Sequence, residues 1–293
     1  MFNVTEIAIE AFGARLKEAY EANFGRQKPD YPDIIAWVGR MSLERIADSD
    51  ALYHDVEHTL MVTLAGQEIL LGKHIREGGV SPDNWLHFMV SLLCHDIGYV
   101  RGVCTGDSDG AYVIDQSGRT FTPPAGASDA SLTPYHVERG KIFVRERFGH
   151  LDLFDADQVI AGLELTRFPV PDVSDARDIS GIAGLVRAAD LIGQLGDPDY
   201  MRKINRLYHE FEETGANQKL GFTSPGDLAA GYPKFFFNAV KPYIGDGLDY
   251  LRVPQRGKQW VANLYAHIFA AEHDQPQLGP QRVRHPVQQV RVE

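Results

Sequence analysis

Histidine and aspartate residues gather in two short stretches of the sequence, residues 53–59 and the pair His95-Asp96. His54 and His58 are four residues apart, so on a helix they lie on one face and can point at one centre. Imidazole and carboxylate groups together suit a borderline or hard divalent cation, and the scarcity of cysteine argues against a cysteine-type structural zinc site. These residue types therefore predict a metal site.

The apolar pattern of the chain places these polar residues on helices. Residues 81–98 are almost wholly apolar, which is typical of a central, buried helix, and His95 and Asp96 come at its end. Burying an imidazole and a carboxylate is unfavourable unless both are paired or bound to a metal. His136 and Asp190 each lie in a later apolar helical segment. We therefore expect several helices to bring polar residues to one centre, as in the metal sites of helical bundles.

Helical periodicity runs through most of the chain. Besides 81–98, the predicted helices cover residues 4–24, 34–47, 55–76, 130–147, 156–166, 179–195, 198–213, 225–244 and 258–271. No strand series, internal repeat or strong linker is visible, so the sequence predicts one all-α domain over residues 1–273. Residues 274–293 are rich in Gln, Pro and Arg without periodicity, which predicts a loosely ordered C-terminal tail.

A long connection, residues 102–128, interrupts the helical pattern. It is rich in Gly, Asp, Ser, Thr and Pro and carries a weak hairpin signal, with short apolar runs at 112–114 and 120–121. Loops of this length are usually functional lids or mobile segments. Because it directly follows His95-Asp96, we interpret it as a lid.

The amino-acid composition narrows the classes of molecule that this protein can be expected to bind. The formal net charge of -11 argues against binding to a nucleic-acid polymer, which usually requires a basic face. A small phosphorylated substrate is still compatible with this charge, because metal ions or a few local arginines can hold it.

The N-terminus lacks the features of a signal peptide, and no run of about 18 apolar residues suggests a membrane span. We expect a cytoplasmic protein, and the aromatic run 235–237 is consistent with core packing or a homo-oligomer contact.

The order H…HD…D, formed by His58, His95-Asp96 and Asp190, resembles the HD-domain metal-dependent phosphohydrolase superfamily. Residues 53–59 (YHDVEHT) are also similar to the YHNxxH signature of cyclic-nucleotide phosphodiesterases, which belong to the same fold group. Asp55 stands where that signature has Asn. The resemblance covers about residues 50–196 and implies a single HD/PDEase-like helical bundle with extra N- and C-terminal helices.

The resemblance also implies roles for individual residues. It implies one set of ligands for a divalent metal ion: His58, His95, Asp96 and Asp190. Asp96 would bridge to a second metal, His136 looks like the extra histidine that binds this second metal, and His54 matches the residue that protonates the leaving oxygen. A further histidine of many dinuclear members is absent here. This leaves three alternatives for the second metal: weak binding, a water-rich coordination, or ligation by Glu164.

The implied activity is hydrolysis of a phosphoester, mono- or diester, of a nucleotide or small phosphorylated metabolite. One or two divalent ions (Mg, Mn, Fe, Zn or Ni) would activate water, because a bound ion lowers the pKa of water and a pair can stabilise both oxygens of an in-line displacement. His54 and Asp96 would be the catalytic residues. Guanidinium groups bind phosphate bidentately, which makes four arginines candidate substrate contacts: Arg101, Arg139, Arg167 and Arg187. Lys203, in contrast, is expected on a solvated helix face.

Two other classes of function remain open. Some HD-fold proteins are di-iron oxygenases, which require a fuller set of ligands for the second metal than the sequence offers. A nucleotide-binding regulatory module with a weak site is the other alternative. The intact H…HD…D set favours an enzyme, because loss of catalysis normally leaves broken ligands.

Overall fold

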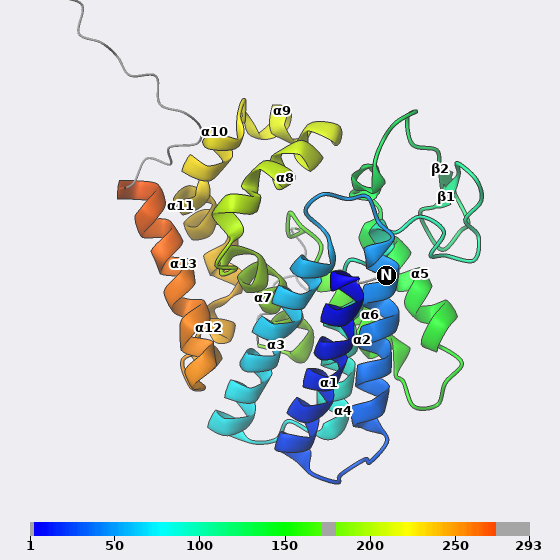
Figure 1. Ribbon diagram of the computed structural model, residues 1–293, viewed down its shortest axis with the longest axis vertical. Helices are drawn as coiled ribbons and strands as arrows, with labels where there is room; N and C mark the ends of the chain where they lie inside the picture. The colour runs from blue at the N-terminus through cyan, green and yellow to red at the C-terminus, as the bar shows by residue number, and fades with distance from the viewer. Residues whose placement is uncertain (1–2, 172–179, 274–293) are drawn as a thin grey trace, which may run out of the picture.

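The computed structural model describes residues 3–171 and 180–273 and is built almost entirely from helices (Figure 1). The α-helices are α1 (Val4–Phe24), α2 (Tyr31–Ala47), α3 (Val56–Glu77), α4 (Pro82–Cys94), α5 (His136–Phe148), α6 (Ala156–Leu165), α7 (Ile182–Leu195), α8 (Tyr200–Glu213), α9 (Ala216–Leu220), α10 (Pro225–Ala230), α11 (Tyr232–Phe235), α12 (Gly245–Leu251) and α13 (Gln255–His273). The predicted all-α fold class is confirmed. The predicted tail, 274–293, lies outside the described residues.

Helix α4 is the central helix of the bundle, as its apolar sequence predicts. It packs against α2, α3, α6 and α7, and its residues from Trp85 to Cys94 are all buried. Its start is fixed by a capping box, in which the hydroxyl of Ser81 accepts a hydrogen bond from the backbone N–H of Asn84 and the Asn84 side chain accepts one from the N–H of Ser81. Pro82 at the first helical position needs no hydrogen-bond partner for its nitrogen.

Helices α3 and α7 approach each other closely because Gly193 lies at their contact. A Cβ atom at this position would fall 2.4 Å from the Cα of Val62, far inside van der Waals distance. The close packing brings the first turns of α3, which carry His58, next to the turn of α7 that carries Asp190. The helix crossing therefore places two of the predicted ligands side by side.

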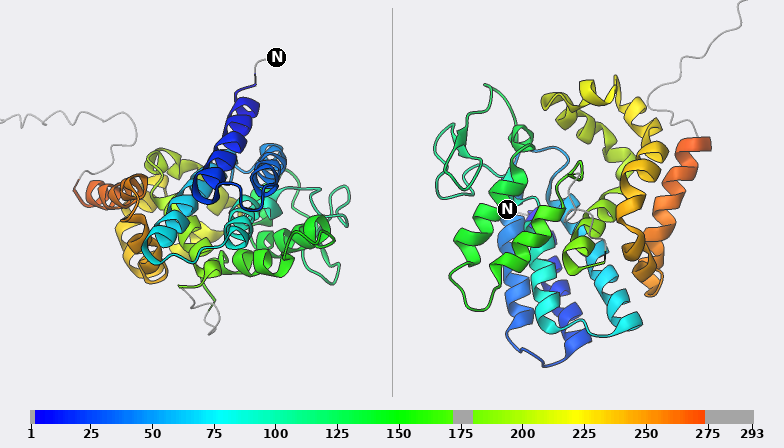
Figure 2. Two further views of the ribbon diagram at one scale, coloured as in Figure 1. Left: turned by 90° about the horizontal axis from the view of Figure 1, so that it is seen from below. Right: turned by 180° about the vertical axis from the view of Figure 1, so that it is seen from behind.

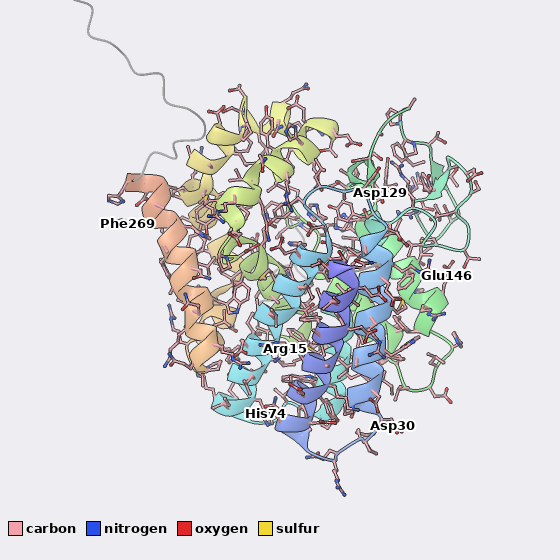
Figure 3. All side chains as sticks on the ribbon, in the orientation of Figure 1. Arg15, Asp30, His74, Asp129, Glu146 and Phe269 are labelled. Carbon is pink, nitrogen blue, oxygen red and sulfur yellow. The ribbon has the colours of Figure 1, made fainter. Side chains whose placement is uncertain are left out.

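The connection 102–128 forms the predicted hairpin, with strand β1 (Tyr112–Val113) antiparallel to β2 (Thr120–Phe121). Near its start the N–H of Thr105 donates to Glu146 on α5, 2.9 Å away, and the residues that flank the connection are joined to each other, because Arg101 pairs with Asp129 at 2.7 Å. Asp129 begins a short 3₁₀ helix, η2 (Asp129–Leu132), and Figure 3 labels both acceptors. The hairpin and α13 lie at opposite sides of the molecule (Figure 2).

The single helix predicted over residues 225–244 is broken. After α10 and α11 the chain continues as a π-helical segment, Phe236–Val240, and a 3₁₀ turn, Lys241–Tyr243. Pro233 and Pro242 explain the breaks, because proline lacks the N–H that a continuous α-helix requires. Within the described ranges 3–171 and 180–273, the helices are too short or too polar to cross a membrane.

Candidate metal centre

Four donor atoms converge at the centre of the bundle. The Nε2 atoms of His58 and His95 lie 3.2 and 3.0 Å from Oδ2 of Asp96 and 3.3 Å from each other. Oδ1 of Asp190 is 3.7 and 3.6 Å from the same two nitrogens. Ligand atoms about 2.1 Å from a shared ion lie roughly 3.0–3.5 Å apart, so the spacing of the two nitrogens and Oδ2 of Asp96 suits one divalent cation. Asp190 joins the two histidines in a group of donor atoms that all lie within 4.8 Å of one another.

Local structure explains how the two histidines point inward. His58 lies in the first turn of α3, where its N–H donates to the N-cap residue Asp55 at 3.0 Å. The ring of His95 donates its Nδ1–H to the carbonyl of Leu92 at 2.7 Å, because a carbonyl can only accept. This tautomer leaves the Nε2 lone pair of His95 available for a metal.

Asp96 occupies the break between α4 and a 3₁₀ helix, η1 (Ile97–Tyr99), so the predicted helix over 81–98 ends earlier than expected. The backbone of Asp96 has φ -104° and ψ 5°, the sparsely populated bridge region where active-site residues often lie. Its Oδ2 atom is buried and has no hydrogen-bond donor of acceptable geometry, although it faces two imidazoles. A buried carboxylate oxygen of this kind requires a nearby positive charge.

The protonation equilibria of the cluster point in the same direction. Burial disfavours a charged imidazole, but the carboxylates of Asp96 and Asp190 raise the pKa of His95 to about 9. Burial also disfavours a charged carboxylate, yet His95 and His58 hold the pKa of Asp96 well below its usual value. For Asp190, the effect of burial outweighs that of the nearby histidines and raises the pKa of the carboxyl group. Asp96 therefore stays charged beside the two imidazoles, whereas burial shifts Asp190 toward its neutral form unless a cation lies close to it.

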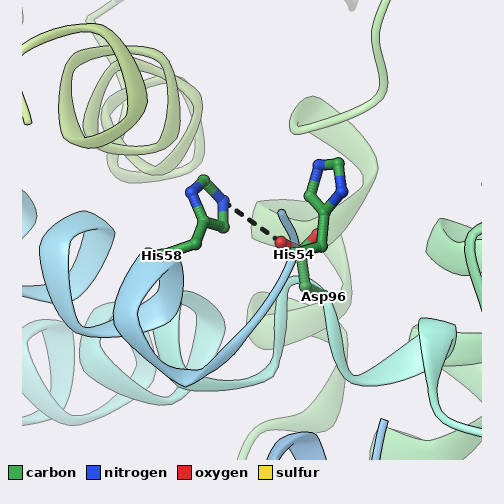
Figure 4. A group of neighbouring side chains, drawn as sticks. All are labelled: His54, His58 and Asp96. Atoms are coloured by element: carbon green, nitrogen blue, oxygen red, sulfur yellow. Dashed lines mark ion pairs between the residues drawn. The ribbon is translucent and has the colours of Figure 1, made fainter. Parts of the chain in front are cut away.

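His54 is held in a different way, by a partner from α8. Its Nδ1 lies 2.6 Å from Oε2 of the buried Glu210, whose Oε1 also accepts the backbone N–H groups of Tyr53 and His54 at 2.7 and 3.3 Å. Burial lowers the pKa of His54, but Glu210 outweighs this effect and raises it to about 9. His54 lies beside Asp96, and each of His54, His58 and Asp96 has one donor atom within 4.8 Å of the other two (Figure 4).

His136, the first residue of α5, faces the other carboxylate oxygen of Asp96. Its Nε2 atom is 3.9 Å from Oδ1 of Asp96, whereas the four-donor cluster uses Oδ2. Its Nδ1–H donates to the carbonyl of Thr133 at 2.6 Å, and burial lowers the pKa of the ring to about 4. Asp96 thus presents one carboxylate oxygen to each side.

The side chains of the site differ in their exposure to solvent. The side chains of His54, His136 and Asp190 are 15–17% exposed, whereas those of His58, His95 and Asp96 are at most 5% exposed. Solvent therefore reaches His54, His136 and Asp190 more readily than the other three side chains.

Arg139 is fully buried, and its guanidinium is engaged inside the protein. Its Nε donates to the carbonyl of Gly98, and its terminal nitrogens donate to the carbonyls of Val100 and Val113 and to both carboxylate oxygens of Asp107, all within 2.6–2.9 Å. It links α5 to η1 and to the long loop. For this reason we do not retain Arg139 as a substrate contact.

The other three candidate arginines also contact protein groups. Arg101 pairs with Asp129, and Nε of the buried Arg187 donates to the carbonyl of Leu165 at 2.9 Å. Arg167 belongs to a charged network on α5 and α6 in which Glu164 pairs with Lys141 at 2.8 Å and with Arg167 at 2.9 Å. Glu164 is part of neither three-residue donor group found among the described residues, so its proposed ligation of a second metal gains no support.

The expectation for Lys203 was wrong. Its side chain is buried between Asp197 and Glu57, at 2.6 and 2.8 Å, and so ties the end of α7 and the first turn of α3 to α8. Glu210, which the sequence analysis missed, lies on the same buried stripe of α8 as Ile204 and Leu207. A carboxylate on an apolar stripe was the signal that could have revealed it.

A family model described as Npun_R2479-like matches residues 2–274. The chain belongs to the Npun_R2479-like family. No curated protein matches its sequence. Among solved structures, this Npun_R2479-like protein is similar to the phosphodiesterase domain of the RhoPDE fusion protein from the choanoflagellate Salpingoeca rosetta, with 16% identity, a TM-score of 0.53, and coverage of 91% of this chain and 92% of that chain. The similarity shows a phosphodiesterase-domain fold.

Proposed function

We propose that this protein is a metal-dependent phosphohydrolase that cleaves a phosphoester of a nucleotide or other small phosphorylated metabolite. The observation that carries the proposal is the position of the His54–Glu210 pair next to a four-donor cluster that suits a divalent cation. The first feature can deliver a proton, and the second can hold an ion against a phosphate. Phosphoester hydrolysis needs both functions at one place.

His58, His95, Asp96 and Asp190 would hold the first ion, and Asp96 with His136 would contact a second. Bound there, divalent ions would supply an activated water and neutralise negative charge on the phosphate. The Nε2 atoms of His95 and His136 would suit this task once they are unprotonated, because the Nδ1–H of each ring is occupied by a backbone carbonyl and Nε2 is the nitrogen left to bind an ion. Asp96 is the shared residue, with one oxygen toward each side.

His54 would donate the proton to the leaving oxygen. Glu210 accepts the Nδ1–H of His54, which fixes the ring and directs its other nitrogen away from Glu210. The same carboxylate stabilises the charged imidazole, so the residue has a proton to give. An alkoxide is a poor leaving group without a proton, whereas a phosphate is a better one. A dedicated proton donor therefore favours an ester of a sugar or other alcohol over a phosphoanhydride.

The similar solved structure supports the proposed hydrolysis of a phosphoester. The domain from Salpingoeca rosetta is described as a phosphodiesterase, and it shares its fold with this chain over most of both lengths. A phosphodiester is therefore the first substrate class to test.

The test is a metal-resolved activity screen. Purified protein is stripped with a chelator, reloaded separately with Mg, Mn, Fe, Zn or Ni, and assayed against nucleotide mono- and diesters and bis-para-nitrophenyl phosphate. We expect turnover with at least one ion, and none in Asp96→Asn, whose side chain keeps the shape of aspartate but loses its charge. Circular dichroism verifies that the variant is folded.

Two outcomes would contradict the proposal. Stoichiometric iron with an O₂-dependent spectral change and no phosphoester cleavage would indicate an oxygenase. Nucleotide binding without turnover under every metal condition would indicate a regulatory module.

A further inference from the structure

Tyr99 lies between the two histidines on the open side of the site. Its ring is stacked on that of His54, with centroids 4.5 Å apart and planes at 14°, and on that of His136, at 4.6 Å and 21°. The tyrosine is buried, 2% exposed. The three rings therefore form one stack in which neither imidazole touches the other.

The backbone of Tyr99 is held firmly in place. The carbonyls on either side of it, those of Gly98 and Val100, both accept hydrogen bonds from the guanidinium of Arg139, at 2.7 and 2.8 Å. Gly98 also lies directly against the start of α5, where a Cβ atom would fall 1.9 Å from the carbonyl oxygen of His136. The tyrosine thus stands on a segment with little freedom to shift.

Each of the two imidazole rings makes one hydrogen bond to the residues that the structure describes. His54 belongs to the connection before α3, and His136 is the first residue of α5, so neither is held within the interior of a helix. Each ring is anchored through Nδ1, His54 to Glu210 and His136 to Thr133. An imidazole with a single hydrogen bond can still tilt about that bond, and a flat contact with a fixed ring restricts this tilt.

We propose that Tyr99 is a positioning residue that sets the spacing and tilt of His54 and His136, the two imidazoles that flank it beside Asp96. The inference rests on the proposed function, in which His54 donates the proton and His136 contacts a second ion. Without the tyrosine ring, the two imidazoles can tilt into the same space. Proton transfer and binding of the second ion then fail together, while the four-donor cluster keeps the first ion.

The test compares Tyr99→Leu with Tyr99→Phe, which keeps the ring, and with Tyr20→Leu, a loss of an equally buried tyrosine on α1. Mn²⁺ binding is measured by isothermal titration, and turnover with the phosphoester found active in the screen. In Tyr99→Leu we expect kcat to fall by roughly 100-fold, the size of effect that slight misplacement of a catalytic group produces. KM should change little, the first equivalent of Mn²⁺ should bind normally, and the second should bind more weakly. Tyr99→Phe should recover most of both properties.

The outcomes separate this inference from the proposed reaction. If the wild type cleaves no phosphoester, but Tyr99→Leu alone among the variants binds the second equivalent of Mn²⁺ more weakly, the positioning role stands and the proposed reaction fails. If Tyr99→Leu matches Tyr20→Leu in metal binding and kcat, or if the Phe variant is as impaired as the Leu variant, the positioning role is wrong. Binding of a single equivalent by the wild type also overturns it, because His136 then has no ion to contact.

Discussion

The two sides of Asp96 are built differently. On the first side, the donor atoms of His58, His95 and Asp190 converge where α3, the C-terminal end of α4 and α7 pack together. Neighbouring donor atoms there are 3.0–3.7 Å apart, and the carbonyl of Leu92 also orients the ring of His95. We call His54 and His136, the two imidazoles that flank Tyr99, the second side, and their orientation depends on Glu210, Thr133 and Tyr99. This difference suggests that the first side binds the ion on its own, whereas the second side acts only when its supporting contacts are intact.

The largest expected effect comes from replacing one histidine of each side with alanine, in two separate variants. His58→Ala should lose both the first metal ion and activity, because it removes one of four ligand atoms. His54→Ala should keep the first ion and lose about 10²–10⁴-fold in kcat, the usual contribution of a proton donor. Metal content by mass spectrometry and steady-state kinetics measure the two effects.

Equal loss of the first ion in both variants would remove the distinction between the two sides. His54 would then be a ligand, which its donor atom within 4.8 Å of those of His58 and Asp96 makes a real alternative.

A smaller effect is expected for Glu210→Gln. The amide cannot stabilise a charged imidazole, so His54 should lose orientation and proton affinity while the first ion stays bound. Loss of a carboxylate that orients a functional histidine typically lowers activity about 10–100-fold. Glu212→Gln, on the same helix but bonded to Asn217, is the matched control and should leave kcat unchanged. A Glu210→Gln enzyme with wild-type kcat would contradict the role given to the pair.

The smallest effect on turnover is expected for Lys203→Met, whose main effect is on stability. The substitution leaves the Asp197 carboxylate buried without its partner, which typically costs about 3–5 kcal/mol. The double variant Lys203→Met/Asp197→Asn should recover much of this loss. Urea unfolding gives the free energies, and kcat per folded molecule should stay near that of the wild type. Loss of the first ion in the single variant would show that the first side also needs outside support.

The same contrast explains what could be predicted from the sequence. The cluster was predictable because His95, Asp96 and Asp190 are polar residues within apolar helical patterns, and helix periodicity is a local property. The hairpin of the long loop was also visible locally. The attachment of this loop to α5 could not be predicted, because it depends on the buried Arg139, whose partner Asp107 lies 32 residues away in the chain.

The contact that orients His54 could not be predicted from the sequence for the same reason. Glu210 meets His54 across 156 residues of sequence, and no local pattern connects them. Lys203 was misjudged because a lysine on a polar helix is usually exposed, and only the carboxylates of Asp197 and Glu57 make its burial favourable.

The origin of Glu210 in α8 has a consequence for the order in which the site is made. All four residues of the first cluster lie before the end of α7 at Leu195, whereas Glu210 comes fifteen residues later. At translation rates of about 5–20 residues per second, the ribosome adds those residues in roughly 1–3 s. A growing chain therefore contains every proposed ligand for the first ion before it contains the residue that would orient the proposed proton donor.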